Sequence, residues 1–254
     1  MKLYFVKAIY FMNYGLPNEL QLKEVEKPVP KDNEVLIKVI ATSINGSDCE
    51  FLRGKPLYAR IIGLRNPRIH ILGSDIAGIV EGIGSKVTKF QLNDHVFGDN
   101  LEKLGGFAEY VCVPETKLII KPDCLTFEQA STLPQGACIA LQGIRDLGEV
   151  KSGQKVLING AGGSAGSFAI QIAKLMGAEV TGIDGPMKLN AILSWGADKV
   201  IDYTKDDFTK NGMKYNLILD LIGYHSIKDY KRSIAPNGKY FLVGGSSAWW
   251  RDSD

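Results

Sequence analysis

The sequence predicts an α/β protein of two domains, an antiparallel, barrel-like domain at residues 1–125 and a parallel sheet covered by helices at residues 126–254. The chain has 254 residues, of which 45% are hydrophobic and 23% charged, and this is enough to form two cores. Its first half alternates short β-rich runs with Gly and Pro. Its second half alternates apolar strands with helical patterns, an order that predicts a parallel sheet.

Short strands separated by turns fill the predicted first domain. The N-terminal stretch predicts a strand on which Leu3 and Phe5 point inward, because side chains alternate along a strand. Further strands are expected at Glu34–Ile40, Ile76–Val80, Asp94–Gly98 and Ala108–Val113. Few long helical patterns lie between them, and this favours a mostly antiparallel, barrel-like arrangement.

Helices and strands alternate in the predicted second domain. A helix begins near Thr126, because a hydroxyl followed closely by Glu128 and Gln129 is typical of a helix cap. Strands are then expected at Lys155–Asn159, Glu179–Ile183, Val200–Ile201, Tyr215–Asp220 and Lys239–Val243. Further helices are expected at about 165–176, where Gly177 ends the helix, and at 187–195.

Composition and charge exclude several classes of partner. A net charge of +2 gives no electrostatic reason to expect nucleic acid or an anionic membrane. No apolar run approaches the roughly 18 residues of a membrane span, and the N-terminus lacks the features of a signal peptide. The cysteines have neither Cys-x-x-Cys spacing nor a His cluster, and they indicate thiols in the cytoplasm. They are Cys49, Cys112, Cys124 and Cys138.

A glycine-rich motif, Gly160-Ala-Gly-Gly-Ser-Ala-Gly166, follows an apolar strand and opens an amphipathic helix. That context is typical of a dinucleotide site, because glycines let the backbone approach a pyrophosphate at a helix N-terminus. The alternative interpretation is a plain structural turn. The residues expected to contact the cofactor here are Gly160, Ala161, Gly163, Ser164, Ala165 and Gly166.

The end of the second strand of this domain bears on the choice of dinucleotide. Asp184 lies there, and a carboxylate at this point usually binds the ribose 2′-hydroxyl of NAD and repels the 2′-phosphate of NADP. Lys188 and Tyr203 lie close behind, and together they could hold a 2′-phosphate. Alternatively, Lys188 is a solvated helix residue and Asp184 a turn or cap residue. The residues alone leave the preference open.

Several separate segments resemble one protein family. They are Ala41-Thr-Ser-Ile-Asn45, Gly73-Ser-Asp-Ile-Ala-Gly-Ile-Val80, Glu81-Gly-Ile-Gly84, Gly105-Gly-Phe-Ala-Glu-Tyr110, Leu133-Pro-Gln135 and the run from Gly153 to Asp202. Together they are similar to the medium-chain dehydrogenase/reductase superfamily, in its zinc-independent quinone oxidoreductase branch (zeta-crystallin-like). The resemblance covers essentially the whole chain. It implies a GroES-like partial β-barrel domain followed by a Rossmann domain with a doubly wound parallel sheet.

The resemblance also implies the cofactor and the absence of a catalytic metal. Zinc-containing relatives carry Cys where this chain has Asn45 and His where it has Ser74, so we expect no metal site. Lys188 and Tyr203 fall where NADPH-using relatives hold the 2′-phosphate. We therefore expect NADPH, with NADH possible because of Asp184.

Asn45 is the expected catalytic residue. By resemblance it lies beside the nicotinamide and the substrate carbonyl, where its amide could stabilise developing negative charge. Alternatively it is a turn-forming Asn. The activity implied is that of an NADPH:quinone oxidoreductase-like reductase, acting without zinc on a quinone or an α,β-unsaturated carbonyl. One departure from the family pattern, Glu50, leaves the substrate class open, and another, Ile139 in place of a frequent Thr, implies one hydrogen bond fewer near the nicotinamide.

The chain is shorter than its relatives, and we expect it to be truncated at the C-terminus. The closing residues, with Trp249 and Trp250, do not resemble the family's continuation. An exposed sheet edge could support a homodimer. Two other functions stay open. One is a zinc-independent alcohol dehydrogenase or enoyl reductase, and the other is a non-catalytic nucleotide-binding structural protein.

Overall fold

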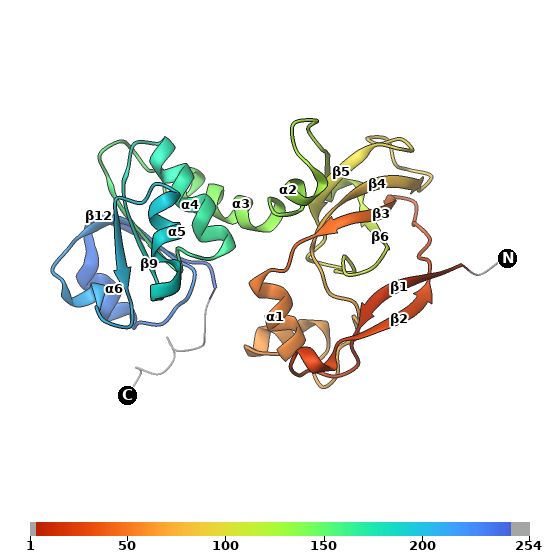
Figure 1. Ribbon diagram of the computed structural model, residues 1–254, viewed down its shortest axis with the longest axis horizontal. Coiled ribbons are helices and arrows are strands. Elements are labelled where there is room, and N and C mark those ends of the chain that lie inside the picture. Colours follow the sequence, from red (N-terminus) through yellow and green to blue (C-terminus); the bar gives the residue numbers. More distant parts are fainter. Residues whose placement is uncertain (1–3, 245–254) are drawn as a thin grey trace. The chain divides into compact units, whose positions relative to one another are not determined.

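The computed structural model describes residues 4–244 and divides into two compact units, 1–135 and 136–254 (Figure 1). Each unit is described by itself below. Leu3, which was expected to point inward, and the closing pair Trp249 and Trp250 lie outside the described residues. Within residues 4–244, no helix is long and apolar enough to cross a membrane.

Unit 1 is built mainly of antiparallel strands. The strands are β1 (Phe5–Tyr10), β2 (Gln21–Glu26), β3 (Glu34–Thr42), β4 (Asp75–Ile83), β5 (His95–Asp99), β6 (Tyr110–Pro114) and β7 (Leu118–Ile120). The helices are η1 (Pro17–Glu19), α1 (Gly46–Arg53), η2 (Leu57–Ile62), η3 (Glu115–Lys117) and α2 (Phe127–Ser131). The helix α3 (Pro134–Leu141) begins in unit 1 and continues into unit 2.

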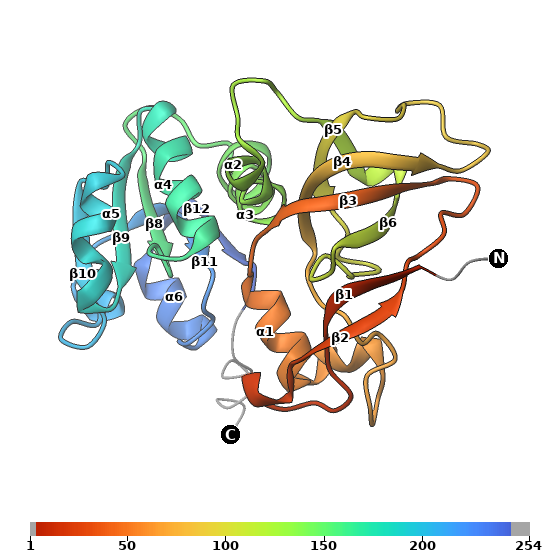
Figure 2. The same ribbon diagram turned by 45° about the vertical axis from the view of Figure 1, so that its right-hand side comes forward.

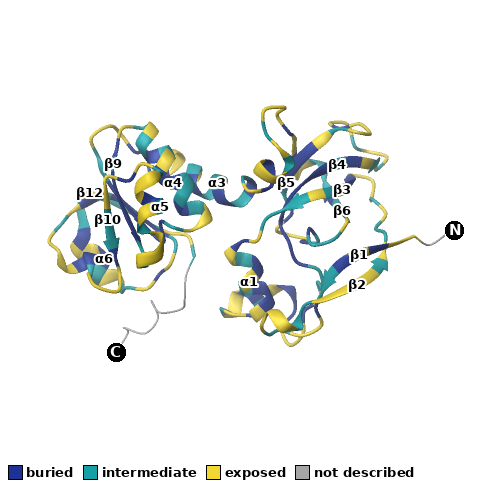
Figure 3. Cartoon of the chain, viewed as in Figure 1, coloured by how far each residue is buried: buried dark blue, intermediate teal, exposed yellow. Residues whose placement is uncertain are grey.

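The main sheet of unit 1 has the strand order β6-β3-β4-β5-β7, and β1 pairs with β2 as a separate hairpin. Inward-facing residues of β3, β4, β5 and β6 form its core, whereas β2 is largely exposed. Dark blue marks the buried residues in Figure 3. Bulges in the β3–β4 pairing bend the sheet, as the closing of a partial barrel requires. The GroES-like domain expected from the sequence is therefore confirmed.

The first strand is present, but its predicted inward face was wrong. Val6 and Ala8 are buried, whereas the side chain of Phe5 is 58% exposed. Ala8 forms an isolated bridge with Ala108, which fixes the inward side of the strand. Because side chains alternate, an error of one residue in phase exchanges the two faces of a strand.

Helix α2 explains why unit 1 extends to residue 135 and does not end at residue 125. Thr126 caps the helix as expected: its hydroxyl accepts the N–H of Gln129 at 3.2 Å, and Gln129 returns a bond to the backbone of Thr126. The buried Ala130 packs with Ala77 and Phe97 of the barrel sheet. The helix thus belongs to the core of unit 1.

Unit 2 is an all-parallel sheet with helices between its strands. The strands are β8 (Lys155–Asn159), β9 (Glu179–Asp184), β10 (Lys199–Asp202), β11 (Tyr215–Asp220) and β12 (Ile234–Leu242). The helices after α3 are η4 (Gln142–Asp146), α4 (Ser164–Leu175), η5 (Pro186–Lys188), α5 (Leu189–Ser194), η6 (Phe208–Lys210) and α6 (Ile227–Ser233). The spatial order β10-β9-β8-β11-β12 is that of a Rossmann sheet, which confirms the predicted fold.

Both faces of this sheet are covered, as a parallel sheet requires. Val156 and Ile158 of β8 pack with residues of α4 and α5 in one cluster. Leu157, between them in sequence, packs on the opposite face with Phe208 and with Tyr230 of α6. Figure 2 shows α4, α5 and α6 around the strands of this unit. The order reverses between β8 and β11, where an open α/β sheet usually binds its ligand.

Candidate functional site

The glycine loop joins β8 to α4 in unit 2. Gly160 has a φ of +85°, which favours glycine, and the N–H groups of Gly160 and Ala161 both donate to the carbonyl of Ile183 at 3.0 Å. A Cβ on Gly166 would lie 2.5 Å from the carbonyl oxygens of Gly160 and Ala161. Only glycine therefore lets the first turn of α4 lie against the loop.

The first turn of α4 contains the remaining residues predicted from the motif. Gly163 is the N-cap of this helix, and Ser164, Ala165 and Gly166 are its first three residues. The N–H groups of a helix's first turn have no acceptor within the helix, and they carry the positive end of its dipole. The structure thus brings all of the motif residues together in a cradle of the kind that binds a pyrophosphate.

Asp184 lies at the end of β9 and is tied to the glycine loop. Its Oδ2 accepts the N–H of Gly162 at 2.8 Å, and its Oδ1 accepts the N–H of Gly185 at 2.8 Å. The sequence prediction omitted Gly162, although its place as the second glycine of the loop could have identified it. Asp184 therefore has a structural task in addition to any contact with a ribose.

Lys188 and Tyr203 lie beside Asp184. The ammonium of Lys188 is 3.5 Å from Asp184 Oδ1, and the stem of this side chain passes over Gly162. Tyr203 lies beside Gly185, since a Cβ built on Gly185 would be 3.5 Å from the ring of Tyr203. Both side chains are exposed, so their polar ends are open to solvent. Lys188 and Tyr203 thus both lie near the end of β9, and their contact with a 2′-phosphate stays a prediction.

A buried carboxylate that the sequence prediction missed lies where the strand order reverses. Asp220, at the end of β11, is fully buried, and its Oδ1 accepts Asn159 Nδ2 at 2.8 Å and the N–H of Gly223 at 2.9 Å. Its Oδ2 accepts the hydroxyl of Tyr240 at 2.9 Å. Burial, and then the charge of Asp220, raise the pKa of Tyr240. The sequence feature that could have identified Asp220 is its position as an Asp at the end of an apolar strand.

Asn45 follows β3 in unit 1 and stands at the N-cap of α1. It is buried, and its Nδ2 donates to Asp75 Oδ2 at 2.9 Å and to Ser43 Oγ at 3.3 Å. Its backbone N–H donates to Asp48 Oδ2 at 2.8 Å. Both amide hydrogens are therefore engaged within unit 1. Donation to a substrate oxygen requires exchange of the longer bond, the one to Ser43.

Asp75, at the start of β4, links three segments of unit 1. It is fully buried, and besides Asn45 and Ser43 it binds the N–H of Gln135 through Oδ1 at 3.0 Å. Burial raises the pKa of Asp75 to about 6, against the lowering effect of the hydrogen bonds from Asn45 and Ser43. The negative charge of Asp99 adds to the rise. Asp75 thus fixes the amide of Asn45.

Other polar residues of the matching motifs have local tasks. Asp48 Oδ1 accepts the N–H of Gly73 at 3.0 Å, and burial raises the pKa of Asp48. Glu50 accepts a hydrogen bond from the hydroxyl of Tyr58. The hydroxyl of Ser74 is buried without a hydrogen-bond partner among residues 4–244. The bond of Asp48 thus joins α1 to the turn before β4, and that of Glu50 joins α1 to η2.

The histidines lie in three different settings. His70 Nδ1 is 3.0 Å from the carbonyl of Phe11, His95 packs on Phe127, and His225 packs on Phe208. Among the described residues, no group of three or more His, Cys, Asp or Glu side chains is placed to hold a metal ion.

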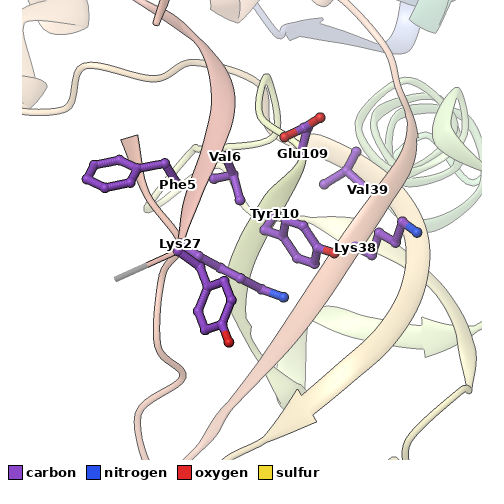
Figure 4. Close-up of a pocket in the computed structure, with 8 residues that line it drawn as sticks. Phe5, Val6, Lys27, Lys38, Val39, Glu109 and Tyr110 are labelled. Atoms are coloured by element: carbon purple, nitrogen blue, oxygen red, sulfur yellow. The ribbon is translucent and has the colours of Figure 1, made fainter. Parts of the chain in front are cut away.

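A pocket of about 430 Å³ lies in unit 1, among β1, β3 and β6 (Figure 4). Lys27 beside it is already partnered, since its Nζ lies 3.1 Å from Glu81 Oε2 and 3.7 Å from the ring centre of Tyr110. None of the predicted site residues lines this pocket. The candidate site therefore does not include it.

Family models match both halves of the chain. The alcohol dehydrogenase GroES-like domain matches residues 31–123, and the model described as zinc-binding dehydrogenase matches residues 165–249. The quinone oxidoreductase of Sus scrofa is 31% identical over 94% of this chain and 73% of its own length. The chain belongs to the quinone oxidoreductase branch of the medium-chain dehydrogenase/reductases. The resemblance inferred from the motifs is confirmed.

Other relatives of this quinone oxidoreductase-like chain are longer proteins. The 2-methylene-furan-3-one reductase of Solanum lycopersicum is 34% identical over 86% of the chain and 57% of its own length. The NADPH-dependent alkenal/one oxidoreductase of Arabidopsis thaliana is 35% identical over 86% of the chain and 58% of its own length. The chain thus spans less than two thirds of these two relatives.

Solved structures agree with this membership. A quinone oxidoreductase of Pseudomonas syringae is 30% identical with a TM-score of 0.84, covering 94% of this chain and 74% of that one. The quinone oxidoreductase of Coxiella burnetii is 28% identical with a TM-score of 0.83, covering 96% and 84%. Membership of this family indicates a nicotinamide nucleotide as cofactor. Zinc independence stays a prediction from the residues.

Proposed function

We propose that this chain is an NADPH-dependent reductase of quinones or α,β-unsaturated carbonyls. The observation that carries the proposal is the glycine loop between β8 and α4, seated at the carboxyl ends of a parallel sheet. Relatives named quinone oxidoreductase and alkenal/one oxidoreductase support the two substrate classes.

The loop residues fit a dinucleotide. Because Gly166 allows α4 to begin directly on the loop, the N–H groups of Ser164 and Ala165 can face a pyrophosphate. When bound, the nicotinamide supplies a hydride for the reduction, and the protein contributes orientation and electrostatics. Asp220 and Asn159 fasten the segment after β11, so that Ile222 packs against Gly160. These contacts support the glycine loop from the neighbouring strand β11.

NADPH is the cofactor we favour over NADH. A 2′-phosphate needs cations and hydroxyl donors, and the exposed ends of Lys188 and Tyr203 supply both beside the end of β9. Asp184 would repel a phosphate, but its carboxylate is engaged by two backbone N–H groups and by Lys188. Its charge is therefore partly compensated.

In unit 1, we assign Asn45 the task of donating a hydrogen bond to the substrate oxygen as negative charge develops there. Asp75 holds this amide in place, with Nδ2 and Oδ2 2.9 Å apart. The bond to Ser43, at 3.3 Å, is the weaker of the two and is the one to be exchanged for the substrate. Asn45 then polarises the carbonyl without needing a metal contact of its own.

The test is a titration of the purified chain with NADPH and with NADH, followed by nicotinamide fluorescence. Benzoquinone or methyl vinyl ketone is then added to the bound complex, and loss of NADPH absorbance is measured. Tight NADPH binding and turnover of either acceptor support the proposal, and the faster acceptor identifies the substrate class. Binding without turnover on any carbonyl would favour a non-catalytic nucleotide-binding role. Absence of binding by either nucleotide would overturn the proposal.

A further inference from the structure

The connection between α1 and β4 carries a local charge that the net charge of the chain conceals. Residues 51–74 include no Asp or Glu, although the whole chain has a net charge of only +2. We call residues 53–68 the basic turn. Its cations are Arg53, Lys55, Arg60, Arg65 and Arg68. Figure 2 shows this connection, in light orange, at the surface of unit 1.

Large apolar side chains point outward from the same turn. Ala59 and Ile62 of the 3₁₀ helix η2 are buried in a cluster with Phe51 of α1. With three residues per turn, this leaves the other positions facing solvent. The exposed fractions are 76% for Leu57, 57% for Tyr58, 86% for Ile61 and 72% for Leu64. Scattered single apolar residues are common on surfaces, but these four lie within eight residues of one short helix and the turn that follows it.

Internal hydrogen bonds hold the basic turn in shape. Arg60 donates from Nε to the carbonyl of Gly54 at 3.1 Å and from a terminal nitrogen to the carbonyl of Leu64 at 2.9 Å. The hydroxyl of Tyr14 donates to the carbonyl of Gly63. Arg60 is thus used within the fold, whereas the other four cations are exposed. The apolar side chains are presented by an ordered element.

We propose that the basic turn binds the surface of a membrane containing anionic lipids. Its apolar side chains would enter the boundary of the acyl chains, and its exposed cations would lie among the lipid phosphates. An apolar group bordered by Lys and Arg is the pattern of interfacial membrane segments, and each cation near an anionic surface adds roughly fivefold to binding. The chain would then meet acceptors that are dissolved in lipid.

Charge favours a membrane over a second copy of this chain. In a twofold dimer the same patch meets itself, so the exposed cations Lys55, Arg65 and Arg68 would lie against a surface that carries the same cations. Like charges across such an interface are repulsive. An anionic lipid surface satisfies the cations and the apolar side chains together.

The experiment is co-sedimentation with vesicles at low salt. Vesicles of phosphatidylcholine alone are compared with an equal mixture of phosphatidylcholine and phosphatidylserine. The chain is expected to sediment with the mixed vesicles and to stay in solution with phosphatidylcholine. High salt should reverse the binding, because it screens the charges.

Two double variants test the two parts of the patch. Ile61→Asp with Leu64→Asp removes apolar contact, and Arg65→Glu with Arg68→Glu reverses charge; each should weaken vesicle binding at least tenfold. Matched controls in unit 2 are Leu175→Asp, at a site 88% exposed, and Lys205→Glu. The controls should bind as the unmodified chain does. All of these side chains are exposed, and the melting temperature verifies folding.

Three results would overturn the proposal. They are absence of binding to the mixed vesicles, equal binding to both vesicle types, and equal losses in the patch and control variants. Dimers in sedimentation velocity that dissociate in the Ile61→Asp variant, without vesicle binding, would assign the patch to a second copy instead. The assay needs neither NADPH nor turnover, so its outcome is independent of the proposed reductase activity.

Discussion

Lys188 is the residue on which the choice of dinucleotide depends most directly. We expect Lys188→Ala to weaken NADPH binding by about tenfold and to leave NADH binding nearly unchanged, because only NADPH carries a 2′-phosphate for a charge-assisted bond. The measurement is the ratio of the two dissociation constants. Lys205→Ala, which removes another exposed cation of unit 2, is the matched control. Equal losses for both nucleotides would remove Lys188 from phosphate recognition.

Asn45 is expected to act on turnover and not on cofactor affinity. Asn45→Ala should lower kcat by about 100-fold, the usual loss when a donor to a developing oxyanion is removed. The dissociation constant for NADPH should change less than twofold. Asn33→Ala, in an exposed position of unit 1, is the control. Turnover equal to that of the unmodified chain would exclude Asn45 from the mechanism.

Asp75 should make the stability of unit 1 depend on pH. Its pKa of about 6 is above the value of 3.8 for an unperturbed Asp, so the folded state binds this proton more tightly than the unfolded chain. Stability should therefore fall as pH rises from about 4 to about 6 and then level off, by about 3 kcal/mol at most.

The variant Asp75→Asn isolates this contribution. Urea unfolding of both proteins at several pH values gives the difference in unfolding free energy, original minus variant. That difference should decrease between about pH 4 and pH 7, because only the original titrates there. Asp48, whose pKa burial also raises, is present in both proteins and cancels, whereas the repulsion between Asp99 and Asp75 is lost in the variant and is part of the measured difference. A difference independent of pH would contradict the assignment.

Single residues were predictable where a motif fixes them and unpredictable where only folding brings them together. The glycine motif lies between β8 and α4 as the sequence indicated, and Lys188 lies beside Asp184, while the contacts of these residues with a cofactor stay predictions. The sequence could not show that Asp184 binds the N–H of Gly162, or that Asp220 reaches Asn159 from a strand sixty-one residues away. Such long-range pairs depend on the order of strands in the sheet, which local patterns do not contain.

At the scale of elements, the contact between the glycine loop and α4 should be intolerant of any side chain. Gly166→Ala would place a Cβ 2.5 Å from two carbonyl oxygens, so we expect a loss of about 1–3 kcal/mol in unfolding free energy. Gly163→Ala is the matched control, since its added Cβ would lie 3.4 Å from the nearest atom. Thermal unfolding of both variants is the measurement. Equal stability of the two would show that the helix can shift.

Strands of the parallel sheet were the most predictable elements. The strand expected at Tyr215–Asp220 was found with those bounds, because β-branched and Leu residues run between turn signals. In unit 1 the five expected strands were found, whereas β2, β7 and α1 were not expected. Helix α1 has only eight residues, too few for a clear apolar repeat. The prediction of the inward face of β1 was wrong because alternation alone does not say which of the two faces is buried. The bridge between Ala8 and Ala108, which the local pattern does not contain, fixes the buried face.

At the scale of the whole molecule, the cofactor should stabilise unit 2 in particular. NADPH at about a hundredfold its dissociation constant should raise the unfolding free energy of unit 2 by about 2.7 kcal/mol. Trp195 packs against the core of unit 2, so its fluorescence follows the unfolding of that unit. Circular dichroism follows both units. A cofactor-induced shift in circular dichroism without any shift in tryptophan fluorescence would contradict binding to the glycine loop.

The boundary between the units illustrates why whole-molecule features are hard to predict. A change of pattern near residue 125 was visible in the sequence, but the helix α2 that follows packs on strands of unit 1. Local pattern gives the kind of element, whereas the core it joins depends on tertiary packing. The expected boundary was therefore earlier in the chain than the end of unit 1.

Asp184 both accepts hydrogen bonds from the backbone of the glycine loop and lies at the strand end that bears on coenzyme preference. This combination has a consequence for the redesign of that preference. Replacing the carboxylate at the end of β9 is the obvious first step toward a stricter NADP enzyme. Here that exchange would also remove the acceptor of the Gly162 N–H and loosen the turn that we propose to receive the pyrophosphate. Libraries built on Lys188 and Tyr203, whose outer ends face solvent, can alter selectivity while keeping the turn intact.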